Sequence, residues 1–169
     1  QTSLELINLA KDMGRILMVG HTFEYTAAVN KAKEIMDSGE LGEPLYISSI
    51  RLNLGLFQPD INVTWDLAPH DIAIILFLLG RQPIEVSAIG ATHLNPAIED
   101  VAVLTVRFSD NLIAYIQTSW LDPDKVRKMT IVGSKKMMVC SCIIEPSSKN
   151  LTLEEKKQYL EYTNGIGRV

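Results

Sequence analysis

An unbroken run of eight apolar residues, Ile72 to Leu79, most constrains what this chain can fold into. With segment 65–71 (Trp-Asp-Leu-Ala-Pro-His-Asp) before it and Gly80 after it, the run predicts a helix over residues 66–80. A helix that is apolar on all sides belongs in a protein core, and this run is too short to span a membrane. The helix nevertheless begins with Asp66, His70 and Asp71, and buried charge is costly unless it is hydrogen-bonded or used.

Asp66 and His70 are four residues apart, which predicts that both side chains lie on one face of the helix. The positive end of the helix disfavours a protonated histidine, whereas a neighbouring carboxylate favours one. Together these effects predict an imidazole that is neutral near pH 7 and ready to take a proton, as a general base requires. The alternative is structural: Asp66 is the N-cap and His70 a hydrogen-bonded core histidine.

Charge and cysteine content limit the classes of function. The net charge of −4 and the lack of a basic run argue against a nucleic-acid partner, and nothing in the sequence predicts a membrane protein. Cys140 and Cys142 are the two cysteines of the chain. They have no matching His/Cys set for a metal, so we expect no metal site and reduced thiols in a cytoplasmic protein without a signal peptide.

The N-terminal residues resemble the end of an α/β domain. Residues 3–13 have helical spacing, and the short apolar run 16–20 is typical of a strand covered on both faces of a parallel sheet. We therefore interpret residues 1–22 as the last helix–strand step of a truncated Rossmann-type domain, which makes the chain a fragment. Ligands bind at the ends of such strands, so His21, Glu24 and Tyr25 are candidate contacts. A polar connector is the alternative.

Residues 23–142 predict an α+β domain with an open, mainly antiparallel sheet and helices packed on one face. The helices are expected at 26–38 and 66–80, and the strands at 45–56, 85–92, 101–108, 112–120, 127–132 and 136–142. Short links between consecutive strands favour a meander, with a break at 121–124. Residues 143–169 are a divergent tail that includes a polar helix over 152–162.

Further polar residues are candidates with open alternatives. Arg51 and Asn53 share one face of the long strand, which is either a substrate wall or a wet subunit interface. Lys125, with Arg127 and Lys128, either binds an anionic substrate group or is a solvated strand entry. We expect His93, next to Asn95-Pro96, to be a surface residue.

The chain resembles the glucose–fructose oxidoreductase / inositol dehydrogenase (Gfo/Idh/MocA) family over residues 1 to about 140. The segments that carry the resemblance are 16–25, 38–42, 65–71, 119–120 and 131–133. The resemblance implies an N-terminal Rossmann domain for NAD or NADP and a C-terminal domain whose sheet is a homo-oligomer interface. Asp66 and His70 match the family's conserved Asp and His.

The resemblance also implies hydride transfer between NAD(P) and a sugar or nucleotide-sugar hydroxyl or ketone. His70 would take the hydroxyl proton and Asp66 would orient the imidazole. The substrate would be contacted by His21, Tyr25, Asn53, Trp65 and Lys125, and the cofactor by His21 and Glu24.

Two departures from the family bear on activity. The chain contains neither the family's glycine-rich loop nor its E-K-P lysine, and it diverges from Cys140 onward. We therefore expect this chain alone to bind NAD(P) weakly or not at all. The alternative function is a non-catalytic module for sheet-mediated dimerisation or sugar binding.

Overall fold

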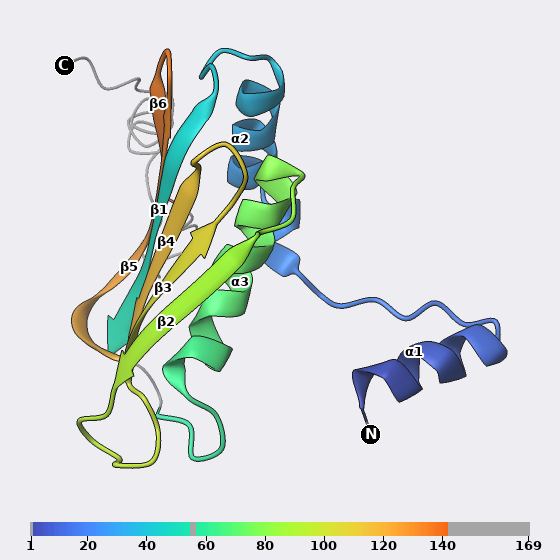
Figure 1. Cartoon of the computed structure of the whole chain (residues 1–169). Coiled ribbons are helices and arrows are strands. Elements are labelled where there is room, and N and C mark those ends of the chain that lie inside the picture. The colour runs from blue at the N-terminus through green and yellow to red at the C-terminus, as the bar shows by residue number, and fades with distance from the viewer. Residues whose placement is uncertain (1, 55–56, 142–169) are drawn as a thin grey trace, which may run out of the picture.

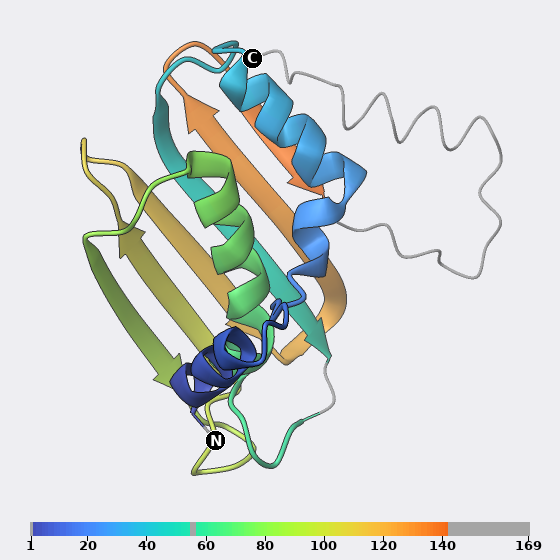
Figure 2. The ribbon, with the colours of Figure 1, turned by 90° about the vertical axis from the view of Figure 1, so that its right-hand side faces the viewer.

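The apolar helix lies against one face of a six-stranded sheet, as the computed structural model shows (Figures 1 and 2). The structure describes residues 2–54 and 57–141. The helices of the sheet layer are α2 (Ala27–Asp37) and α3 (Val63–Leu79), and both cover the same face. The strands are β1 (Pro44–Leu54), β2 (Glu85–Ala91), β3 (Val101–Arg107), β4 (Ile113–Ser119), β5 (Leu121–Gly133) and β6 (Met137–Ser141). The predicted α+β class, with helices on one face of a mainly antiparallel sheet, is confirmed.

Strand order differs from the predicted meander. The order is β2-β3-β4-β1-β5-β6, so β1 lies between β4 and β5, and its pairing with β4 is parallel. The predicted break at 121–124 is wrong, because β5 runs continuously from Leu121 to Gly133. The register between β1 and β5 shifts between Leu52 and Leu54, which pair with Val126 and Leu121. This irregularity accommodates Pro123, which has no N–H for a ladder hydrogen bond.

The helix α3 begins three residues earlier than predicted. The side chain of Asn62 accepts a hydrogen bond of 3.0 Å from the backbone N–H of Trp65, so Asn62 is the N-cap and the Asp66 alternative is wrong. Pro69 consequently lies inside the helix rather than in its first turn. The helix ends as predicted at Gly80, whose φ of 61° is the left-handed conformation that glycine adopts without strain.

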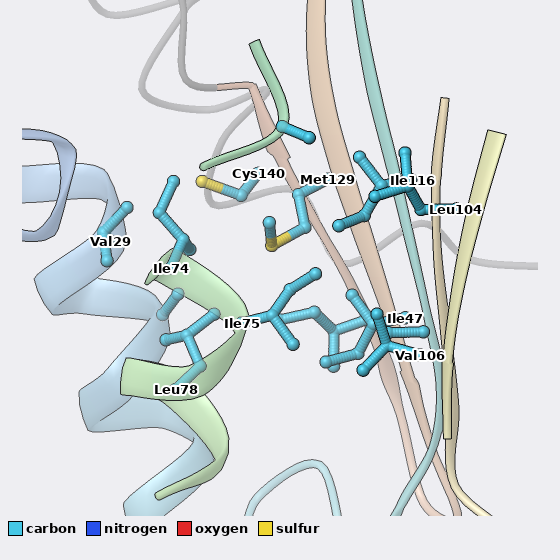
Figure 3. Packing of buried hydrophobic residues seen from close by; sticks show 14 of the residues in the cluster. Val29, Ile47, Ile74, Ile75, Leu78, Leu104, Val106, Ile116, Met129 and Cys140 are labelled. Atoms are coloured by element: carbon cyan, nitrogen blue, oxygen red, sulfur yellow. The ribbon is translucent and has the colours of Figure 1, made fainter. Parts of the chain in front are cut away.

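The core lies between α2, α3 and the sheet (Figure 3). Ile75 of α3 points toward the sheet, where the alternation of β1 and β4 presents Ile47 and Ile116, while Ile74 and Leu78 are buried on the side of α3 nearer to α2. Cys140 of β6 is buried in the same cluster. Among the described residues, no helix combines the length and apolarity that crossing a membrane requires.

The N-terminal helix is confirmed as α1 (Ser3–Asp12), capped by reciprocal hydrogen bonds between Thr2 and Glu5. The predicted strand over residues 16–20 is not formed, and the side chain of Ile16 is 98 % exposed. A parallel strand is stable only between neighbouring strands, and no described segment pairs with this one. Cys142 and the predicted helix over 152–162 lie outside the described residues.

Candidate active site

A cavity of about 520 Å³ lies beside the first turns of α3. Its wall is mostly apolar, and its polar side chains include His21 and Glu24, which come from the short helix η1 (Thr22–Tyr25) and the residue before it. The indole of Trp65 is 75 % exposed on the rim. The structure thus brings three of the predicted site residues to one cavity. The lining residues are His21, Glu24, Thr64, Trp65, Pro69, Ile72, Ala73, Leu76 and Phe77.

His70 lies at a smaller hollow that adjoins this cavity. The hollow is lined by His21, Phe23, Glu24, His70 and Ala73, and three of these residues also line the larger cavity. His70 is partly buried, so its imidazole is neither sealed in the core nor free in solvent. The hollow is too narrow to hold a water molecule, so His70 borders the larger cavity only through the residues that the two share.

Burial lowers the pKa of His70 below its ordinary value, and the positive charge of Arg51 lowers it further. The carboxylates of Asp71 and Asp66 act in the opposite direction, and Arg127 adds a smaller lowering effect. The lowered pKa agrees with the expected neutral imidazole, and Asp66 raises the pKa as expected, but the largest cause of the lowering is burial rather than the helix end. The field of a helix end acts mainly on residues of the first turn. Because α3 begins at Val63, His70 lies beyond that turn and this field is weak there.

Asp66 has a different partner from the one the spacing suggested. Its Oδ2 accepts a hydrogen bond of 2.9 Å from Nε1 of Trp120, a side chain that is 1 % exposed at the end of β4. In the part of the chain that the structure describes, no hydrogen bond joins Asp66 to His70. Asp66 acts on His70 through its charge, which raises the pKa of the imidazole.

Arg51 forms a buried ion pair on the helix-facing side of the sheet. Its Nε and Nη2 donate to the two carboxylate oxygens of Asp71 at 2.6 and 3.0 Å. Both side chains are almost inaccessible to solvent, so the expectation that Arg51 lines a substrate wall or a wet interface is wrong. The guanidinium also lies 4.7 Å from the centre of the Phe23 ring.

The remaining predicted residues are dispersed around this centre. Tyr25 is 69 % exposed and lines neither cavity, while Asn53 lies two residues beyond Arg51 on the same face of β1. Lys125 is exposed on β5, and partial desolvation together with the charge of Arg127 lowers its pKa. Lys128 pairs with Ile50 on the opposite face of the sheet, so the predicted basic cluster is divided between two faces.

His93 is partly exposed, as expected, but it is also held in place. Its Nδ1 lies 2.7 Å from Oδ1 of Asp100, and Oδ2 of that carboxylate accepts the backbone N–H groups of His93 and Leu94. Asp100 is buried, and its pKa is lowered: burial opposes the charged form but is outweighed by these hydrogen bonds. This pair fixes the loop after β2, at a distance in sequence from the cavity residues.

Sequence reasoning missed Phe23, Asp71 and Trp120 as site residues. Phe23 and Trp120 are apolar in character and gave no signal of their own, although both fall in segments that carried the family resemblance. Asp71 was noted as a charge at the start of a core helix, and a buried carboxylate of this kind requires a buried cation. That requirement could have identified Arg51 as the buried partner of Asp71.

Comparison with known proteins places this geometry in a family. Residues 29–139 match the model of the GFO/IDH/MocA C-terminal domain. The chain is 28 % identical over 129 residues to UDP-N-acetylglucosamine 3-dehydrogenase of Acidithiobacillus ferrooxidans, which covers 75 % of the chain and 39 % of that protein. It is 26 % identical over 157 residues to 2,7-anhydro-N-acetylneuraminate hydratase of Mediterraneibacter gnavus, covering 82 % and 41 %.

Two further comparisons agree. The chain is 27 % identical over 123 residues to scyllo-inositol 2-dehydrogenase (NAD(+)) of Bacillus subtilis, covering 67 % of the chain and 36 % of that protein. The solved structure of the Acidithiobacillus enzyme superposes with a TM-score of 0.66 at 26 % identity, covering 82 % of this chain and 44 % of that one. The chain thus spans about two fifths of the length of these curated relatives. Since the family model matches more than half of its residues, the protein belongs to the GFO/IDH/MocA family and carries that family's C-terminal domain.

Proposed function

We propose that this chain is the substrate domain of an NAD(P)-dependent oxidoreductase that acts on a hydroxyl or ketone of a sugar or nucleotide sugar. The observation that carries the proposal is the position of His70, a partly buried imidazole with a lowered pKa beside a cavity. Relatives named as dehydrogenases of a nucleotide sugar and of an inositol support the substrate class.

The cavity fits part of a cofactor or a sugar. Its volume of about 520 Å³ lies within the range of small-molecule pockets, and its apolar wall with His21 and Glu24 suits one ring of a ligand. Those two side chains would contact the nicotinamide end, and Trp65 would flank the substrate.

In the proposed oxidation the carbon-bound hydrogen leaves as a hydride to NAD(P)⁺, which supplies the acceptor when bound, and the hydroxyl proton goes to His70. A neutral imidazole can accept that proton, and its partial burial excludes competing water. The negative charge of Asp66 stabilises the imidazolium that results. In the reverse direction His70 returns the proton to the ketone oxygen.

The test is turnover by the protein expressed from the complete reading frame, with His70→Gln as the variant. Loss of the general base is expected to lower kcat by at least about 10²-fold. Nicotinamide absorbance during incubation with nucleotide sugars, free sugars and inositols reports hydride transfer, whereas water addition of the hydratase type leaves it unchanged. His93→Gln is the matched control, because His93 lies on the loop after β2. A His70→Gln enzyme with near-normal turnover refutes the proposed role.

The open face of the sheet supports a second function, self-association. Opposite the helices, neighbouring strands present apolar side chains that are 38–80 % exposed, among them Ile89, Val103, Ile113 and Tyr115. An apolar surface that crosses several strands is typical of a protein interface. We propose that two copies of the chain pack through this face.

A further inference from the structure

Phe23 occupies the point where three elements of the site meet. Its ring centre lies 4.9 Å from the imidazole centre of His70, with the two rings at 68° in an edge-to-face arrangement. The guanidinium of Arg51, from β1, lies 4.7 Å from the same ring centre, and that of Arg127, from β5, lies 5.8 Å away. One aromatic ring therefore contacts side chains of α3, β1 and β5.

The backbone holds this ring in place. The carbonyl oxygen of Phe23 accepts hydrogen bonds from the backbone N–H of Thr26 at 3.1 Å and from its hydroxyl at 2.8 Å. The same hydroxyl accepts the backbone N–H of Val29 and so caps α2. The turn that presents Phe23 is consequently fixed to the first turn of a helix that packs on the sheet.

Arg51 is fixed independently. Its guanidinium is held by two hydrogen bonds to Asp71, the residue that follows His70 on α3. A planar guanidinium held in this way presents a rigid surface to an aromatic ring. His70, Phe23 and Arg51 therefore form one connected group, in which the imidazole is in contact with an ordered ring.

We propose that Phe23 is a positioning residue for His70: its ring sets the orientation of the imidazole and shields it from water. This inference rests on the proposed function of His70 as the proton acceptor. It assigns a specific task to an apolar residue of η1, and it places Arg51 behind that residue as a second support.

The charged groups around His70 agree with this assignment. Arg51 and Arg127 face it from β1 and β5, Asp66 and Asp71 lie on its own helix, and His21 and Glu24 share its hollow. Burial is the largest of the effects that lower the pKa of His70. Phe23 lines the hollow in which the imidazole lies, so its ring supplies part of that burial.

The test is an NMR titration of the His70 ring protons in the 169-residue chain, with assignment by their loss in His70→Gln. In Phe23→Leu, a side chain of lower volume without an aromatic ring, the pKa of His70 is expected to rise toward its ordinary value. The ring-current shift that the Phe23 ring causes in the His70 ring protons is expected to disappear. Phe23→Tyr, which keeps the ring, is expected to restore both. Tyr115→Leu on the open face is the matched control and is expected to change neither.

The outcomes separate the inference from the proposed function. An unchanged His70 titration in Phe23→Leu overturns the inference, whatever the enzyme does. If Phe23→Leu fails to fold, a nuclear Overhauser effect between Phe23 and His70 in the unmodified chain decides the matter, and its absence also overturns the inference. If Phe23→Leu shifts the titration, the complete protein is expected to show the acidic limb of its kcat/KM profile moved to higher pH. A turnover that is independent of His70 refutes the proposed function while the positioning measured by NMR stands.

Discussion

The indole Nε1 of Trp120 donates a 2.9 Å hydrogen bond to Oδ2 of Asp66, and so ties the end of β4 to α3 across 54 residues of sequence. Trp120 is buried, whereas Asp66 is only partly buried, so the bond orients the carboxylate from the protein interior. Phe57 packs edge-on against the indole at 5.9 Å. The position of a proposed site carboxylate is therefore set by the sheet rather than by its neighbour on the helix.

Replacement of Trp120 by Phe is expected to destabilise the protein by about 1–3 kcal/mol, because a hydrogen bond to a charged group is lost. Urea unfolding measures the effect. Trp65→Phe is the matched control, since the Trp65 side chain is largely exposed and little change is expected. Equal midpoints for the two variants would show that the indole hydrogen bond contributes nothing.

Asp66→Asn separates the hydrogen bond from the charge. The amide oxygen can still accept the indole N–H, but the negative charge that raises the pKa of His70 is removed. The pKa of His70 is expected to fall below that of the unmodified protein, which an NMR titration measures. A rise in that pKa contradicts the assigned electrostatic role of Asp66.

The Arg51–Asp71 pair is expected to be more sensitive to loss of one partner than of both. Arg51→Met leaves the Asp71 carboxylate buried and unpaired, with an expected cost of about 3–5 kcal/mol in the free energy of unfolding. The double variant Arg51→Met/Asp71→Leu is expected to recover most of that loss. Lys31→Gln, which breaks an exposed pair with Glu34, is the control and should change stability little. Additive effects of the two single substitutions would contradict this coupling.

Stability is expected to decrease as the pH falls below about 6.5, the ordinary pKa of histidine. In the folded state the pKa of His70 is lowered, so in this range the unfolded chain binds more protons than the folded one. The part of this decrease that is due to His70 continues until the pH reaches the folded-state pKa of His70, and it stops there. Urea unfolding between pH 8 and 5, compared with His70→Gln, measures it. If the free energy of unfolding changes with pH in the same way in both proteins, His70 makes no contribution.

Self-association is expected to depend on the open face of the sheet. Val103→Lys places a charge on the open face at β3, between the apolar side chains of β2 and β4, and is expected to shift the chain toward monomer in sedimentation equilibrium. Val86→Lys is the matched control, because Val86 lies on the helix-facing side of the edge strand β2. A monomeric unmodified chain at high concentration contradicts the proposed interface, as does an equal effect of both substitutions.

Local pattern was enough to predict most of the elements. The apolar run 72–79 required a buried helix, the period-two alternation of 45–54 gave β1 and its two faces, and Gly80 gave the end of α3. Asp110 and Asn111, both with φ of 62°, form the short hairpin link that their side chains favour. These features depend on residues close in sequence, so the sequence itself carries their physical cause.

Tertiary structure decided the order of the strands and the partners of the charged groups. The insertion of β1 between β4 and β5, the burial of Arg51 against Asp71 and the capture of Asp66 by Trp120 all join residues at least 20 positions apart. Whether the apolar run 16–20 becomes a strand depends equally on neighbours outside the segment. Spacing on one helix indicates which side chains can meet, but burial and hydrogen-bond competition across the whole fold determine which of them do.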